Sequence, residues 1–164
     1  MAGQPPLEAS IEIAVPPAGV WAVLSDLRSM SRRSPELVGT WLPGAPRVGR
    51  RALHLNRRRA VVWPTTSRIT RWKDPAHDGG RGALAFHVWP TDVEWSYELV
   101  PTSDGTGTIV TERRSALPRP SLLVRLTARY AMGGADQHDT ELLDGMHRTL
   151  EALAADTHPH PHRS

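Results

Sequence analysis

The chain of 164 residues contains no cysteine, one phenylalanine and a single lysine, Lys73. Without cysteine it has no disulfide, no thiolate metal ligand and no cysteine nucleophile. No apolar run approaches the roughly 18 residues that a membrane-spanning helix needs. The first residues also lack the basic and apolar segments of a secretory signal. These absences predict a cytoplasmic protein that does not insert into membranes.

The positive charge comes almost entirely from arginine, yet the formal net charge is only +3. A protein that binds nucleic acid gathers its positive charge on one face. The one dense cluster, Arg57–Arg59, falls between two predicted strands, a position that favours a solvated turn. We therefore expect no nucleic-acid partner.

Several catalytic and cofactor motifs are missing from the sequence. It has no His-Glu-x-x-His zinc helix, no Gly-x-Ser-x-Gly elbow, no phosphate loop and no dinucleotide fingerprint. His158, His160 and His162 alternate with prolines near the C-terminus, where a mobile tail would not fix the geometry of metal ligands. We expect no metal and no cofactor, and the motifs assign no catalytic residue.

Alternation of apolar and polar residues with a period of two predicts a series of strands. They cover residues 7–15, 37–42, 48–56, 61–72, 83–89, 93–100 and 106–114. A helical stripe around Val20–Leu27 and a short helical piece near Ser29–Arg33 follow the first strand. We expect one domain over residues 7–155, a flexible start at 1–6 and a disordered His/Pro tail at 156–164.

The closing stretch, Pro118–Ala155, predicts a long helix with an apolar face, interrupted at Gly133-Gly134. Two adjacent glycines inside a helix cost roughly 2 kcal/mol relative to alanine, so they predict a bend or a break. Strands that follow one another without intervening helices favour an antiparallel sheet and the α+β class. A long helix laid across such a curved sheet can enclose a pocket.

The same alternation sorts the candidate ligand-binding residues. Aromatic side chains of the strands at 83–89 and 93–100 are expected to point toward the helix. Polar and aromatic residues of the strands at 48–56 and 61–72 would line the same pocket if they face inward. The helix adds residues on both sides of its glycine pair. The full set is Asn56, Trp63, Phe86, Trp95, Tyr97, Tyr130, Met132 and His138. Packing in the core is the alternative role for each of them.

The facing of His54, Arg57 and Arg68 depends on strand register, which the sequence alone does not fix, so inward and outward positions both stay open. Glu112 shares a face with Val110, so its carboxylate is expected to be partly buried. A buried charge needs a partner, and we expect one of the strand arginines to supply it.

Three segments together resemble a known family. They are the opening Val15-Pro-Pro-Ala-Gly-Val-Trp-Ala-Val-Leu-Ser-Asp26, the strand Val93-Glu-Trp-Ser-Tyr-Glu-Leu-Val-Pro101 and the stretch Gly107-Thr-Ile-Val-Thr-Glu112. These motifs are similar to those of the SRPBCC, or START-like, helix-grip superfamily, specifically its polyketide cyclase/dehydrase branch. One departure is the stretch Arg28–Pro35, which replaces a Trp-containing segment of the family.

The resemblance implies a helix-grip fold: a curved antiparallel sheet of six to seven strands wrapped on the C-terminal helix, with two short helices after the first strand. It also implies a cavity for a hydrophobic, aromatic or polyketide-like small molecule. The corresponding roles are natural-product biosynthesis, carriage or self-resistance, including the enediyne subset. A polyketide aromatase/cyclase or dehydratase and a protein-interaction module are the alternatives. The sequence does not determine the oligomeric state.

Overall fold

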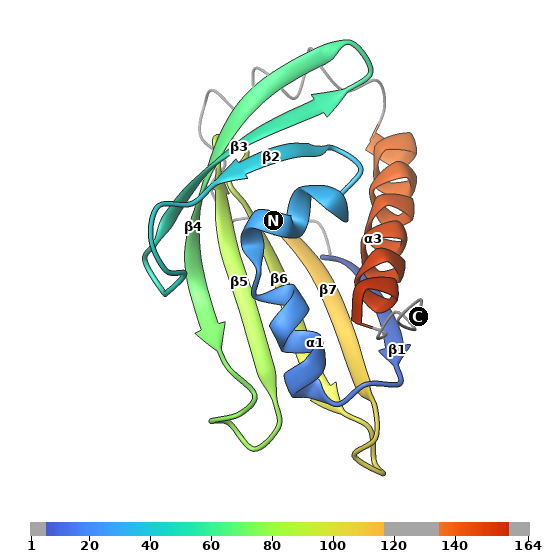
Figure 1. The fold of residues 1–164 in the computed structure, drawn as a ribbon. Helices are drawn as coiled ribbons and strands as arrows, with labels where there is room; N and C mark the ends of the chain where they lie inside the picture. Colours follow the sequence, from blue (N-terminus) through green and yellow to red (C-terminus); the bar gives the residue numbers. More distant parts are fainter. Residues whose placement is uncertain (1–5, 117–134, 158–164) are drawn as a thin grey trace, which may run out of the picture.

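The computed structural model describes residues 6–116 and 135–157, and of residues 135–139 the backbone alone. A first strand is followed by two short helices, six further strands and a long helix (Figure 1). In chain order these are β1 (Leu7–Ile13), α1 (Pro17–Leu24), η1 (Leu27–Arg32), β2 (Leu37–Trp41), β3 (Arg51–Arg58), β4 (Val61–Lys73), β5 (Gly82–Trp89), β6 (Val93–Pro101), β7 (Thr108–Ala116) and α3 (Ala135–Thr157).

All seven strands form one antiparallel sheet in the order β1-β7-β6-β5-β4-β3-β2. Each strand from β2 to β7 pairs with its sequence neighbour, and β1 closes the order by pairing with β7. The two short helices and α3 lie on the same side of the sheet (Figure 1). The predicted α+β class and the helix-grip arrangement are confirmed.

α3 covers the β1–β7 side of the inner face, where it also meets α1. Its buried stripe consists of Met146, Leu150 and Leu153, which recur at helical spacing. These side chains belong to one buried cluster with Leu84, Leu99 and Val110 of the sheet and Leu24 of α1. At the other side of α1, Trp21 meets Trp72 of β4 edge to face, with ring centroids 5.0 Å apart.

Several element boundaries differ from the sequence expectation by a few residues, among them the start of β3 and both ends of β7. β3 continues through Arg58, so only Arg59, with φ of 55°, and Ala60 form the turn that leads into β4. The prediction that all three arginines form the turn is therefore wrong, because a two-residue connection suffices between antiparallel strands. α3 runs to Thr157, two residues beyond the expected end of the helix.

The expected helical start at Pro118 and the break at Gly133-Gly134 lie outside the described residues. Within the described ranges, no helix is long and apolar enough to cross a membrane.

Candidate ligand-binding site

Burial along the inner face of the sheet changes from one end of the strands to the other. Leu84 on β5 and Leu99 on β6 are fully covered, whereas Phe86 and Trp95, further toward the first turn of α3, are half-buried. The same change runs along β7 from Val110 to Arg114. The inner face therefore has a fully packed half and a half-buried part, in which half-buried side chains stand among covered ones such as Val93 and Thr65, and only the half-buried side chains can contact a ligand.

Four predicted residues occupy this part of the inner face as two separate cross-strand pairs. Phe86 and Trp95 are direct cross-strand partners on β5 and β6, and Asn56 and Trp63 are direct partners on β3 and β4. All four have inner-face positions by register and are half-buried. Ile69, the β4 partner of Phe86, is six positions from Trp63, so the two pairs mark the two ends of a stretch of the inner face. We call this stretch, with its three aromatic side chains and one amide, the aromatic wall; its composition is typical of small-molecule sites.

A row of hydrogen bonds crosses the three strands beside this wall. Thr40 Oγ1 on β2 lies 3.0 Å from His54 Nδ1 on β3, and His54 Nε2 lies 2.7 Å from Ser67 Oγ on β4. Asn56 Nδ2 donates to Thr65 Oγ1 at 2.9 Å and to the Trp63 carbonyl at 3.4 Å. Thus His54, whose direction the sequence left open, faces inward and occupies the middle of a polar row.

Burial lowers the pKa of His54 from its ordinary value of 6.5, because an imidazolium ion loses hydration there. At neutral pH the ring is therefore uncharged, with one nitrogen that donates and one that accepts. A neutral imidazole with a hydroxyl at each nitrogen can exchange a proton with Thr40 or Ser67, and through that hydroxyl with a bound carbonyl or phenol. Sequence reasoning missed Thr40 and Ser67, which lack any motif and are brought together only by strand register.

Deeper in the face, Tyr97 and Glu112 form a cross-strand pair of β6 and β7. The Tyr97 hydroxyl donates to Glu112 Oε1 at 2.7 Å, and the two residues are only 3% and 2% exposed. Glu112 Oε2 has no hydrogen-bond partner among the described residues. The expected arginine partner is therefore replaced by a tyrosine, since Arg57 and Arg68 alternate onto the opposite face of the sheet.

Burial raises the pKa of Glu112 to about 7, although the Tyr97 hydrogen bond pulls it down. Burial also raises the pKa of Tyr97 far above its usual range, and the Glu112 charge adds to that rise. The pair accordingly carries a proton at physiological pH more readily than isolated side chains would. It lies in the packed half of the face, so Tyr97 is set apart from the aromatic wall.

An ion pair joins the two sides of the half-buried end. The Arg58 guanidinium, at the end of β3, pairs with Glu141 in the early part of α3 and lies 3.8 Å from Glu36. Figure 1 shows the β3–β4 turn beside the start of the α3 ribbon. Arg58 therefore links the far edge of the sheet to the helix across the end where the inner face becomes accessible.

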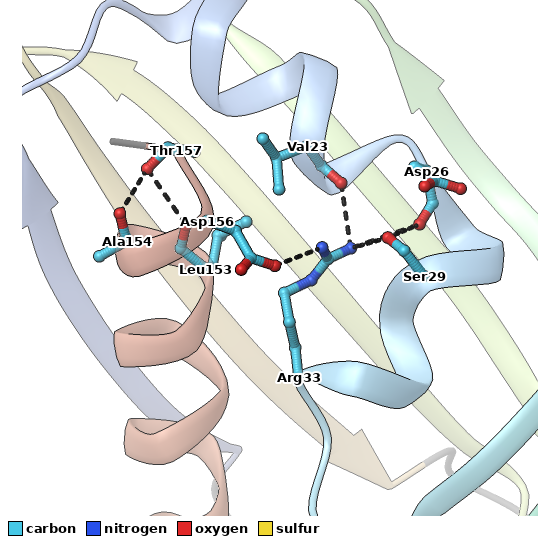
Figure 2. A network of polar contacts seen from close by, with 8 residues as sticks. All are labelled: Val23, Asp26, Ser29, Arg33, Leu153, Ala154, Asp156 and Thr157. Atoms are coloured by element: carbon cyan, nitrogen blue, oxygen red, sulfur yellow. Dashed lines mark hydrogen bonds and ion pairs between the residues drawn. The ribbon is translucent and has the colours of Figure 1, made fainter. Parts of the chain in front are cut away.

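A second polar cluster fixes the opposite end of α3 (Figure 2). Arg33 is buried, and one guanidinium nitrogen donates to the Val23 carbonyl at 3.0 Å, to the Asp26 carbonyl at 3.3 Å and to Ser29 Oγ at 2.8 Å. Another donates to Asp156 Oδ2 at 3.1 Å. This single side chain ties α1, η1 and α3 together beside a hollow of about 390 Å³.

The remaining predicted residues are not placed by the described side chains. Tyr130 and Met132 lie outside the described residues, and His138 belongs to α3, of which only the backbone is described at that point. Their contribution to the site stays a prediction.

The sequence profile of a family described as polyketide cyclase / dehydrase and lipid transport matches residues 4–156. The chain belongs to this family. No curated protein matches the chain at a significant level.

Solved structures share the fold across nearly the whole chain. The Zhui aromatase/cyclase from Streptomyces sp. R1128 superimposes with a TM-score of 0.65 at 18% identity, covering 93% of each chain. A START superfamily protein from Mycobacterium smegmatis gives 0.61 at 16% identity, covering 93% of this chain and 99% of the other. A STAR-related lipid transfer protein from Xanthomonas axonopodis gives 0.60 at 15% identity, with coverages of 93% and 85%. At these identities the likeness shows a common fold.

Proposed function

We propose that this polyketide cyclase-like protein binds a hydrophobic, aromatic or polyketide-like small molecule between the sheet and α3. The half-buried aromatic wall beside a row of hydrogen-bonding side chains carries the proposal. Phe86 and Trp95 would stack on flat apolar surface, and Asn56 Oδ1 would accept a hydrogen bond from a hydroxyl group of the ligand, since Asn56 Nδ2 already donates to the protein. The role would be carriage, sequestration or self-resistance in natural-product biosynthesis in the cytoplasm.

Native mass spectrometry of the purified chain tests this proposal, because a ligand that co-purifies adds its mass to the folded protein. The test variants are Phe86→Ala and Trp95→Ala. We expect each of them to purify without the ligand mass and to show no ligand-dependent rise in melting temperature. Trp89→Ala is the matched control, since Trp89 is an exposed residue on the other face of β5. Retention of the ligand by both inner-face variants would contradict the proposed site.

One observation favours an enzymatic alternative, an aromatase/cyclase or dehydratase. The row Thr40–His54–Ser67 holds an uncharged imidazole beside the aromatic wall. A polyketide substrate carries carbonyl groups, and their enolisation needs proton transfer. His54→Gln should then abolish turnover of a polyketide substrate while it leaves the bound mass unchanged. Equal loss of binding and turnover would instead assign His54 to binding alone.

A further inference from the structure

The outer face of β2–β5, which is directed away from α3, carries an exposed apolar patch. Its members come from four neighbouring strands: Trp41 lies opposite Leu53 and Leu55 opposite Pro64, whereas Thr66 separates Leu53 from Trp89. We define the outer patch as Trp41, Leu53, Leu55, Val62, Pro64 and Trp89. Trp41 is 67% exposed and Trp89 56%. Across four strands such a patch is about 14 Å wide, and an apolar surface of this extent marks an interaction site.

Arginines flank the outer patch on both sides along the strands. Arg51 and Arg68 are direct cross-strand partners at one end, and Arg57 pairs with Val62 at the other. None of these three forms an ion pair with a residue that the structure describes. Strands β2, β3, β4 and β5 contain no aspartate or glutamate at all. Like charges directly opposite each other destabilise a sheet, so this arrangement calls for an external anion.

We propose that the outer patch binds the surface of an anionic lipid membrane. Indole rings favour the boundary between headgroups and acyl chains, because they have an apolar body and one N–H donor. Guanidinium groups bind phosphates with two hydrogen bonds, and each basic residue near an anionic surface adds attraction. The protein would lie on the membrane, with the aliphatic side chains and tryptophans at headgroup depth.

Charge argues against a second copy of the chain as the occupant. Two outer patches facing each other would bring Arg51, Arg57 and Arg68 of both copies together. The carboxylate in the cross-strand row of Arg68 is that of Glu94 on β6, which lies beyond the patch and already accepts a hydrogen bond from Thr70. A folded acidic partner would need a carboxylate matched to every guanidinium. Phosphates of a fluid lipid surface move to the arginines wherever these lie, so they satisfy the same charges without a matched shape.

Co-sedimentation of the full chain with vesicles tests the proposal. Vesicles of phosphatidylcholine alone are compared with vesicles of equal parts phosphatidylcholine and phosphatidylglycerol. We expect binding to the anionic vesicles only, weakened by added salt. Arg51→Gln and Arg68→Gln should each weaken binding about fivefold, and the double variant Trp41→Ala/Trp89→Ala should lose at least tenfold.

The double variant Ile109→Ala/Arg113→Gln is the matched control, because it removes an exposed apolar residue and an arginine from the distant β7 part of the same face. It should bind as the unaltered chain does. Quenching of tryptophan fluorescence by brominated lipids provides a second measurement that needs no loss of an aromatic ring. Trp41→Phe and Trp89→Phe should each reduce the fraction of the fluorescence that is quenched.

Two outcomes would overturn the proposal. One is a vesicle result: either the chain does not bind anionic vesicles, or the patch variants bind them as well as the unaltered chain does. The other is concentration-dependent dimerisation in analytical ultracentrifugation that Trp41→Ala/Trp89→Ala abolishes, which would assign the patch to a second copy. Both outcomes are independent of the ligand on the inner face.

Discussion

The Tyr97 hydroxyl and the Glu112 carboxylate face each other across β6 and β7, 2.7 Å apart and almost completely covered. A carboxylate in this position has one oxygen held and one oxygen without a described partner. A proton on that second oxygen removes the cost of a buried charge, and it ties the stability of the fold to pH.

The first prediction concerns this pH dependence. The pKa of Glu112 is raised from 4.5 to about 7, so between these values the folded chain holds a proton that the unfolded chain has released. The free energy of unfolding should therefore fall by on the order of 3 kcal/mol as pH rises through this window, and change no further above it. Glu112→Gln cannot ionise and should remove this fall, as measured by thermal melts at about pH 5 and about pH 8.

The lowered pKa of His54 acts with the opposite sign, because below 6.5 the unfolded chain takes up a proton that the folded chain does not. The comparison is therefore made between Glu112→Gln and the unaltered chain at each pH. Identical pH profiles for the two would disprove the role of Glu112.

Tyr97→Phe should separate the hydrogen bond from the packing of the ring. It removes the donor that stabilises the ionised carboxylate, so the pKa of Glu112 should rise further. We expect a loss of about 1–3 kcal/mol at pH values above the Glu112 pKa. In the Glu112→Gln background the same substitution should cost less, and additive losses in denaturant titrations would show that the two side chains do not interact.

His54 should titrate below its ordinary value. We expect nitrogen-detected NMR to show an uncharged ring at neutral pH, with a midpoint below 6.5. Ser67→Ala removes one of its two hydroxyl neighbours and should shift the balance between the two tautomers, because a hydrogen bond on one nitrogen selects where the proton lies. A midpoint above 6.5 would mean that the ring carries a charge at this site.

The ion pair between Arg58 and Glu141 should affect ligand exchange more than stability. Both side chains are substantially exposed, so Arg58→Gln or Glu141→Gln should change the free energy of unfolding by less than about 1 kcal/mol. If the pair spans the entrance to the inner face, either variant should speed both association and dissociation in stopped-flow fluorescence. Unchanged rates in both variants would place the entrance elsewhere.

Substitution of Arg33 should lower the free energy of unfolding much more than substitution of its acidic partner, Asp156. Arg33→Met leaves the Val23 and Asp26 carbonyls without this donor in a buried setting and should cost about 2–4 kcal/mol. Asp156→Asn affects a half-exposed partner and should cost less than about 1 kcal/mol. Chemical denaturation of both variants checks this contrast, and equal losses would mean that the ion pair dominates the cluster.

Strand periodicity predicted the sheet well, because residues such as Trp95, Tyr97 and Leu99 alternate with the polar residues of β6 and each face has one environment. The helix-grip arrangement followed from family resemblance. Facing was predictable on β5 and β6 for the same reason. The facing of β3 residues was not predictable, because each face of this strand mixes apolar and polar residues, as His54, Leu55 and Asn56 illustrate. Only the pairing of β3 with β4 decides which residues face inward.

Contacts between distant elements escaped prediction for a different reason. Arg33 and Asp156 are 123 positions apart, and nothing in the local sequence of either indicates the other. The cluster Arg57–Arg59 was interpreted as a solvated turn, and sequence order did not show that Arg51 and Arg68 lie side by side on neighbouring strands.

The pairing of β1 with β7 has a consequence for how the protein is made. Ser10 on β1 meets Thr111 on β7, a separation of 101 positions. On the ribosome, the first strand has no partner until nearly three quarters of the chain has emerged, while β2 to β6 pair with neighbours as they appear. Contacts of such long range slow the completion of a fold. The amino-terminal strand therefore joins the sheet last, and an interrupted translation product ending before β7 would leave β1 unpaired and one edge of β6 open.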